Sequence, residues 1–165
     1  MAIANTKSTI VTNGDAEPAA STSSFINKGR AVKQTGFVEV LAADDDNSVY
    51  RFHRVPSGVR VSSVKMKNDA ITVGSDYNLG FYDVPDNGGL IVGGGNELAD
   101  NLDLTSARDI PTEVLSGVVE EDSEKRIWEL LGLSEDPHVE YDVCLTAIAV
   151  GSSVGTIQLE IEYLH

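Results

Sequence analysis

The sequence is poor in cysteine, in basic residues and in long apolar runs, and each scarcity excludes a class of protein. Its 165 residues include one cysteine, Cys144, which excludes an internal disulfide framework and a metal site built from several thiolates. No apolar run approaches the roughly 18–20 residues that span a bilayer, and the first residues lack the apolar segment of a secretory signal. We therefore expect neither a transmembrane helix nor a secreted, disulfide-rich domain.

Basic residues are outnumbered by acidic ones, 12 against 26, which gives a formal net charge of −14 and an isoelectric point near 4.4. Such a chain is not expected to bind nucleic acid or an anionic membrane, because phosphate groups attract Lys and Arg. Hydrophobic residues make up 41% and charged residues 23%, as in ordinary globular proteins. The length fits one domain, or one domain with a tail.

The first 35 residues differ in composition from the rest of the chain. Residues 1–34 carry four basic and two acidic residues, a net charge of +2, whereas residues 35–165 carry eight and 24, a net charge of −16. A stretch so rich in small polar residues cannot bury enough apolar surface to fold alone. It fits an extended basic arm that becomes ordered on a partner, with Phe25 and Ile26 as apolar anchors. The same composition also fits a terminus without a role.

From Gly36 onward, hydrophobic and polar residues alternate in short segments that are separated by turn residues, a pattern typical of β-strands. Pro56-Ser57-Gly58 is one such turn. The strands predicted from this pattern cover residues 37–41, 48–55, 59–67, 76–84, 139–146 and 156–163. The first is expected to be buried on both faces. The turn at residues 151–153 predicts that the last two strands form a C-terminal hairpin.

The middle of the chain is less regular. Residues 96–106 predict a short helix or a loop whose leucines point inward. A helix is predicted over residues 122–131, where Asp122 or Ser123 can cap the free amides of the first turn and Gly132 follows the last turn. About seven or eight short strands without βαβ alternation fit an antiparallel sandwich or barrel.

Candidate catalytic and metal-binding residues are few. A small hydrolase would need His53 or His138 within hydrogen-bond reach of a serine or a carboxylate. Asp44, Asp45 and Asp46 offer the oxygen ligands that a hard cation prefers, but the run lacks the spacing of a calcium loop. A solvated turn is the favoured interpretation of this run, and weak cation binding stays open. The sequence therefore predicts no catalytic residues, no metal and no cofactor.

Several strings of residues 36–165 carry a family resemblance. They are Tyr50-Arg51-Phe52, residues 55–61, 68–71 and 76–82, Trp128-Glu129-Leu130-Leu131-Gly132-Leu133 with Asp136-Pro137, Tyr141-Asp142-Val143, and Gly155-Thr156-Ile157 with Tyr163. Together they resemble small head proteins of tailed double-stranded DNA bacteriophages, and in particular the capsid decoration or cement proteins. The matching motifs are strand and turn patterns, not catalytic signatures.

The resemblance implies a mainly β protein: an antiparallel jelly-roll-like β-sandwich over residues 36–165 with one short helix, preceded by an extended N-terminal arm over residues 1–35. It implies a structural protein of the virion, made in the host cytoplasm, that binds the outside of an assembled head and clamps neighbouring major capsid protein subunits. Such proteins act as homodimers or homotrimers, without enzymatic activity, cofactor, direct nucleic-acid contact or membrane contact. The residues expected to bind the capsid are Phe25, Ile26, Lys28, Arg30 and Lys33.

One alternative function is a carbohydrate-binding β-sandwich on the virion surface. Such a module would expose aromatic platforms, for which Trp128 and Tyr82 are the candidates, beside Asp and Asn side chains. Trp128 is the weaker candidate because it widens the apolar side of the predicted helix.

Overall fold

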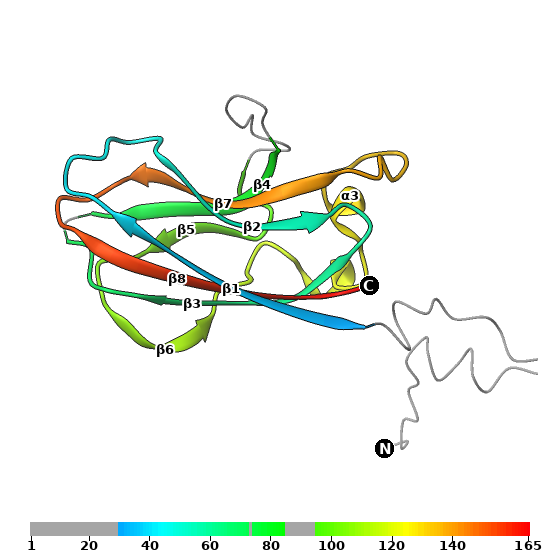
Figure 1. Cartoon of the computed structure of the whole chain (residues 1–165), viewed down its shortest axis with the longest axis horizontal. Helices are drawn as coiled ribbons and strands as arrows, with labels where there is room; N and C mark the ends of the chain where they lie inside the picture. Colours follow the sequence, from blue (N-terminus) through cyan, green and yellow to red (C-terminus); the bar gives the residue numbers. More distant parts are fainter. Residues whose placement is uncertain (1–29, 73, 85–94) are drawn as a thin grey trace, which may run out of the picture.

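The computed structural model describes residues 30–72, 74–84 and 95–165, which form two antiparallel four-stranded sheets packed against each other (Figure 1). The predicted β-sandwich is confirmed. The elements in chain order are β1 (Ala31–Val40), β2 (Val49–Pro56), β3 (Arg60–Asn68), β4 (Asp76–Asp83), β5 (Ala99–Asp103), β6 (Arg108–Glu113), the 3-10 turn η1 (Glu120–Asp122), the short helix α3 (Ile127–Leu130), β7 (Glu140–Ala149) and β8 (Gly155–Leu164).

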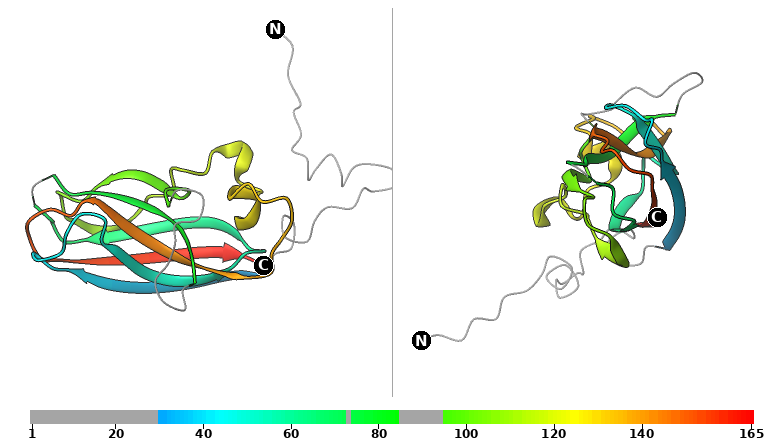
Figure 2. Two further views of the ribbon diagram at one scale, coloured as in Figure 1. Left: turned by 90° about the horizontal axis from the view of Figure 1, so that it is seen from above. Right: turned by 90° about the vertical axis from the view of Figure 1, so that its left-hand side faces the viewer.

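The strand order defines a jelly roll. One sheet, called sheet A below, has the order β1-β8-β3-β6, and the other, sheet B, has the order β2-β7-β4-β5. The pairs β1–β8, β2–β7, β3–β6 and β4–β5 are therefore nested, as if one long hairpin had been rolled into two layers. Figure 2 shows these layers from two further directions.

The core fills the space between the two sheets. Strand β4 contributes Tyr77, Leu79 and Phe81, and each is fully buried. Strand β8 contributes Leu159 and Ile161 from the opposite sheet, also with no exposed surface. Each such side chain stabilises the fold by about 1.5–3 kcal/mol relative to an exposed one, so the alternation along these strands is enough to hold the layers together.

The predicted C-terminal hairpin is wrong. Strand β7 lies in sheet B and β8 lies in sheet A, so the turn between them crosses from one layer to the other. Gly151 supports this turn with a φ of +85°, a left-handed conformation that glycine adopts without steric cost. Alternation tells which face of a strand is buried, but it does not tell which strand is the partner.

The first strand also differs from its prediction. It begins at Ala31 instead of near Gly36, and it is an edge strand with one buried face. Val32 and Val38 pack on the core, whereas Phe37 points outward and is 79% exposed. The local run of hydrophobic residues suggested two buried faces, but an edge strand of a two-layer fold covers the core on one side only.

The middle of the chain holds two strands that the sequence did not predict. Residues 99–103 form β5 where a short helix or loop was expected, although the flanking Leu98 and Leu104 are fully buried, as expected of inward residues. Strand β6 was missed because residues 109–113 are all exposed and therefore show no alternation.

The helix is shorter than predicted and starts later. Asp122 belongs to η1, and α3 covers only Ile127–Leu130. The amide of Ile127 donates to the carbonyl of Val59 at 2.9 Å, and that of Trp128 donates to the carbonyl of Ser57 at 3.2 Å. The turn between β2 and β3 therefore satisfies two amides of the first turn of α3, where we expected a side-chain cap at Asp122 or Ser123. No helix among the described residues is long and apolar enough to cross a membrane.

Candidate functional site

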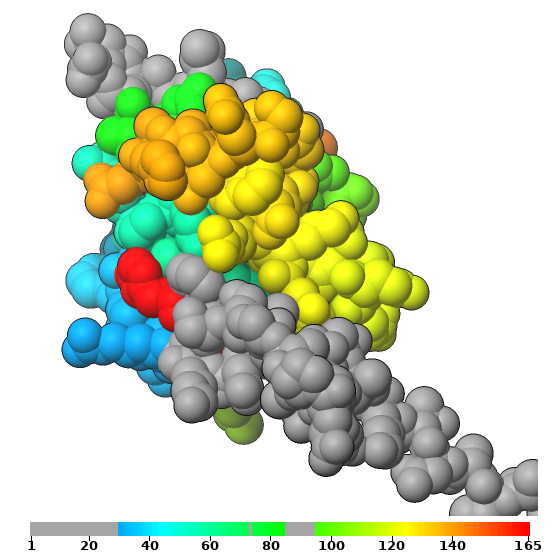
Figure 3. Space-filling view, turned by 90° about the vertical axis from the view of Figure 1, so that its right-hand side faces the viewer, coloured from blue at the N-terminus to red at the C-terminus, as the bar shows by residue number. Residues whose placement is uncertain are grey.

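The predicted capsid-binding residues lie at and before the start of β1. Phe25, Ile26 and Lys28 fall outside the described residues. The backbone of Arg30 is paired with that of His165, since each amide donates to the other residue's carbonyl, at 3.3 and 3.0 Å. In Figure 3 the last residues of the chain lie beside the start of β1 and the turn between β2 and β3. The start of β1 therefore lies at the end of the sandwich where β8 ends.

Lys33 lies within β1 on the outer face of sheet A. Its Nζ is 2.7 Å from Oε1 of Glu160 on β8, and the side chain is 56% exposed. An ion pair this exposed contributes at most about 1 kcal/mol, so the ammonium group can exchange to another carboxylate at little cost. The structure thus describes two of the five predicted residues, Arg30 and Lys33, and places both next to β8.

A shallow hollow lies at the same end of the sandwich. It has a volume of about 460 Å³ and is lined by the turn between β2 and β3, by Arg126, by residues 138–140 with Asp136, and by His165. Because the backbone of His165 is paired with that of Arg30, the start of β1 lies next to this hollow.

The floor of this hollow contains Ser57, Asp136 and His138. The hydroxyl of the buried Ser57 donates to Oδ1 of Asp136 at 2.5 Å and accepts the amide of Val139 at 3.2 Å. The amide of His138 also donates to Oδ1 of Asp136, at 2.9 Å. The Ser57 hydroxyl, with smaller contributions from His138, holds the pKa of the Asp136 carboxyl below its usual value. These bonds tie the turn between β2 and β3 to the segment that leads into β7.

The same residue types could suggest a hydrolytic triad, but their order is wrong for one. In a triad, a histidine lies between the serine and the carboxylate and takes the serine proton. Here Ser57 donates directly to the Asp136 carboxylate, and Ser57 is 1% exposed. The His138 imidazole lies on the far side, with Nδ1 3.5 Å from Oδ2 of Asp136. The arrangement therefore holds a turn in place and does not activate a nucleophile.

His53 sits at the corner where β1 and β2 meet. Its Nε2 is 3.0 Å from the backbone carbonyl of Leu159, and burial lowers the pKa of the imidazole. A Cβ added to Gly36 of β1 would lie 3.1 Å from Cε1 of His53, so glycine makes room for the ring. His53 is a packing residue of the sandwich corner.

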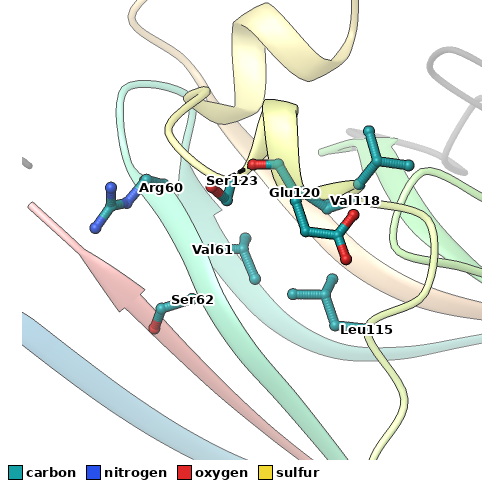
Figure 4. Close-up of a pocket in the computed structure, with 8 residues that line it drawn as sticks. Arg60, Val61, Ser62, Leu115, Val118, Glu120 and Ser123 are labelled. Atoms are coloured by element: carbon teal, nitrogen blue, oxygen red, sulfur yellow. Dashed lines mark hydrogen bonds between the residues drawn. The ribbon is translucent and has the colours of Figure 1, made fainter. Parts of the chain in front are cut away.

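A second hollow, of about 380 Å³, lies between β3 and the segment around η1 (Figure 4). Val61, Leu115 and Val118 supply its apolar lining, and Arg60 and Glu120 supply one charge of each sign. Its two serine hydroxyls are engaged with backbone carbonyls: Ser62 donates to Glu162 at 3.1 Å and Ser123 to Glu120 at 2.7 Å. The hollow therefore has an apolar lining with one charged side chain of each sign, and neither of its serines is paired with a base.

The acidic turn after β1 is bonded to its own backbone. Oδ2 of Asp44 accepts the amide of Leu41 at 2.9 Å, which is the main cause of the lowered pKa of Asp44, and the hydroxyl of Tyr50 at 2.8 Å. Asp46 accepts the amide of Val150 at 3.0 Å. Within residues 30–72, 74–84 and 95–165, no three His, Cys, Asp or Glu side chains gather in a way that could hold a metal ion.

The two aromatic candidates for carbohydrate binding differ in exposure, since Tyr82 is buried and Trp128 is half-buried. Tyr82 is 1% exposed, and its hydroxyl is hydrogen-bonded to that of Thr146. Trp128 lies in α3, and its indole Nε1 is buried without a hydrogen-bond partner. Stacking against a sugar requires an accessible ring face, which Tyr82 does not offer.

Sequence reasoning missed the two most exposed large hydrophobic side chains of the described residues. Phe37 is 79% exposed on β1, and Ile110 is 75% exposed on β6. Phe37 could have been found by following the alternation back to Ala31, because Lys33, Thr35 and Phe37 then fall on one face. No pattern in residues 108–113 identifies Ile110 in advance, because the whole strand is exposed.

Comparison with known proteins bears on the fold. The structure is similar to a chain in the capsid of Ralstonia phage GP4, with a TM-score of 0.58 and 14% sequence identity over 82% of this chain and 84% of that chain. Weaker similarities are to a chain of the cyanophage Pam1 capsid asymmetric unit (TM-score 0.48, 15% identity, 92% of this chain and 94% of that chain) and to a chain of the acid-stable capsid of Helicobacter pylori bacteriophage KHP30 (TM-score 0.42, 14% identity, 83% and 93%). No protein-family model and no curated protein sequence matches the chain. The sandwich is thus a fold that also occurs in a bacteriophage capsid.

Proposed function

We propose that this chain is a structural protein of a bacteriophage head that binds the outside of the assembled shell and clamps neighbouring major capsid protein subunits. The observation that carries the proposal is the shared fold with a chain of the Ralstonia phage GP4 capsid over more than four fifths of both chains. The strand and turn motifs of residues 36–165, which resemble phage decoration proteins, support the same function independently.

The mechanism of such a protein is mass action. A protein that binds the assembled shell, but not its dissociated subunits, stabilises the shell by about 2.7 kcal/mol per site at a free concentration a hundredfold above the dissociation constant. This mechanism needs shape and non-covalent contacts only. The hydrogen bonds of Ser57, Ser62 and Ser123 fit it, because each hydroxyl is engaged in holding a turn or a strand.

The charge of the chain supports an outward position on the shell. Residues 35–165 carry a net charge of −16, so neighbouring virions that display this surface repel each other. The same charge keeps the protein off the genome during packaging, because DNA phosphates repel it.

The segment at the start of the chain supplies the contact with the shell in this proposal. Phe25 and Ile26 act as apolar anchors, and Lys28, Arg30 and Lys33 pair with shell carboxylates. Ordering a residue costs about 1–2 kcal/mol, so the anchors must bury apolar surface for the segment to stay bound. The backbone of Arg30 is paired with that of His165, so in this proposal Arg30 contacts the shell from the end of the sandwich where β8 ends.

Binding to emptied shells of the cognate phage tests this proposal. Removing residues 1–29 leaves β1 intact, because the strand begins at Ala31. The truncated chain and the full-length double variant F25A/I26A should bind the shells at least about tenfold more weakly than the unmodified chain. The variant K7A is the control, since Lys7 belongs to the same segment but precedes Phe25 by 18 positions in the sequence. Shell binding at unmodified affinity by both the truncated chain and F25A/I26A would contradict the assigned role of the segment, and absence of binding by the unmodified chain would contradict the function itself.

A further inference from the structure

Strand β3 has an open edge at Val61. The backbones of Arg30 and His165 exchange both of their hydrogen bonds, so His165 and, by alternation, Tyr163 face β1. Val61 is in register with Tyr163, so its own amide and carbonyl point away from β8, towards the opposite side of β3. Strand β6 lies on that side, but its pairing with β3 covers only residues 65–68 of β3. No strand of the described residues therefore lies beside the free side of Val61.

The main-chain groups on either side of Val61 are engaged. The carbonyl of Val59 accepts an amide of α3 at 2.9 Å. The carbonyl of Val64 accepts the amide of Val114 at 2.8 Å, and the amide of Val64 donates to Oε1 of Glu113, also at 2.8 Å. An open strand edge is a template for another extended segment, and here the opening is one residue pair wide.

The hollow of about 380 Å³ between β3 and the segment around η1 lies at this opening. Figure 4 shows Val61 turned towards Leu115, with Arg60 and Ser62 on the opposite side of the strand. A residue that pairs with Val61 on a neighbouring strand points its side chain to the same face as Val61. The opening therefore fits an extended segment with a large aliphatic side chain at the paired position, where Val61, Leu115 and Val118 form the apolar lining.

The beginning of this chain contains a segment of that kind. Thr9-Ile10-Val11-Thr12 is the longest run of β-branched residues in the sequence, and β-branched residues favour strands. The run carries no charge, so it adds none to a lining that holds one charge of each sign.

The run is long enough in its connection to reach the opening from within the same chain. Ala31, Leu164 and Arg60 lie in one row across sheet A, so the start of β1 is two strand spacings, about 10 Å, from β3. Thr12 precedes Arg30 by 18 positions. An extended chain covers roughly 3.3 Å per residue, or about 60 Å over this connection, which is several times the distance needed.

We propose that residues 9–12 add a short antiparallel strand to the open edge of β3 in their own chain, with Ile10 opposite Val61. Ile10 exchanges two main-chain hydrogen bonds with Val61, and its side chain fills the hollow against Leu115. Val11 points to the outer face, because successive side chains of a strand point to opposite faces.

This docking site goes beyond the proposed function and does not depend on it, because it needs this chain alone. It has one consequence for shell binding. With residues 9–12 docked, residues 13–29 form a loop that is held at both ends. Phe25 and Ile26 then lose less conformational freedom when they bind a shell, so docking favours shell binding.

Hydrogen exchange of the Val61 amide, followed by NMR on the full chain, tests the proposal. Exchange should be at least about tenfold slower in the unmodified chain than in I10S, which removes the side chain that fills the hollow. The matched control is V11S, in which exchange should stay as slow as in the unmodified chain, because Val11 faces outward. The amide of Lys65, which is in register with Glu160 of β8, is the internal reference. Equal exchange of Val61 in the unmodified chain and in I10S would overturn the proposal.

Nuclear Overhauser contacts between methyl groups identify the register. The methyl groups of Ile10 should contact those of Leu115 and Val118. The same contacts made by Val11 instead would overturn the proposed register, because a slip of one residue exchanges the two faces of a strand.

A mixture of two full-length chains tests whether the segment docks on its own body. Labelled I10S with ¹⁵N is mixed with an excess of the unlabelled, unmodified chain, and Val61 of the labelled chain should still exchange fast. Slow exchange in the mixture would assign the opening to the segment of a second copy and would overturn the proposal.

Shell binding of the unmodified chain and of I10S is measured separately. Slow exchange of Val61 in a chain that binds no shells would contradict the proposed function and leave this inference standing. Shell binding by a chain in which Val61 is protected only on the shell would assign the opening to a shell segment. That result would overturn this inference and leave the proposed function standing.

Discussion

Replacing Ser57 with alanine tests how the turn between β2 and β3 is held against the segment before β7. The substitution removes one hydroxyl that is 1% exposed and leaves the volume of the site nearly unchanged. It breaks the 2.5 Å bond to Asp136 and takes away the acceptor of the Val139 amide. The matched control is S62A, which removes an exposed hydroxyl bonded to a single backbone carbonyl.

The expected loss of stability follows from these two bonds. A hydrogen bond to a charged group contributes about 1.5–3 kcal/mol, and we take about 2 because Asp136 keeps its bond to the His138 amide. Leaving the amide of Val139 without its acceptor adds about 1 kcal/mol. We therefore expect S57A to lower the free energy of unfolding by about 2–3 kcal/mol at pH 7, which is a fall in melting temperature of roughly 6–9 °C for a chain of this length. S62A should cost no more than about 0.5 kcal/mol.

Urea unfolding followed by circular dichroism measures both variants, and a pH series separates the charged bond from simple packing. The pKa of Asp136 is lowered in the folded protein, first by Ser57, so this bond stabilises the fold above the unfolded pKa of about 3.8 and is lost as the pH falls through the folded pKa. The difference between the unmodified chain and S57A should therefore narrow below pH 4. A loss below 0.5 kcal/mol at pH 7, or a difference that does not change with pH, would refute the reasoning.

Three further outcomes are expected from buried groups elsewhere. Burial lowers the pKa of His53, so its contribution to stability is fully present above about pH 6.5 and falls as the pH drops towards the folded pKa. Between pH 7.5 and 5, urea unfolding should therefore show a smaller fall in the free energy of unfolding for H53Q than for the unmodified chain. G80A should lower the free energy of unfolding by about 1–3 kcal/mol, measured by thermal unfolding. The added Cβ would overlap the backbone of Gly95 and Asn96 and would lie 2.6 Å from the nitrogen of Asn96. Burial raises the pKa of the Cys144 thiol to about 12. Thiol reagents at pH 8 should therefore label the chain only after it is unfolded in urea. Rapid labelling of the folded protein would contradict the buried position.

The fold class could be predicted from the sequence, because a strand that covers a core on one side needs hydrophobic residues at every second position. That requirement is visible at β3, β4, β7 and β8, where the predicted and observed strands agree within a few residues. It is not visible at β6, which is exposed on both faces, or at β5, where Leu98 and Leu104 are buried just outside the strand. The prediction that Phe25, Ile26 and Lys28 bind a shell stays a prediction.

The sequence by itself determined the acidic charge, the two-layer β architecture and the contrast between residues 1–34 and the rest, because composition and alternation are local properties. Only the tertiary structure decided which strands are neighbours, since pairing joins residues more than a hundred positions apart, such as Phe37 and Gln158. It placed β7 and β8 in different sheets, and it brought Ser57 to Asp136. It also gathered five basic and five acidic residues into one neutral sheet, because four strands that are distant in sequence share that surface.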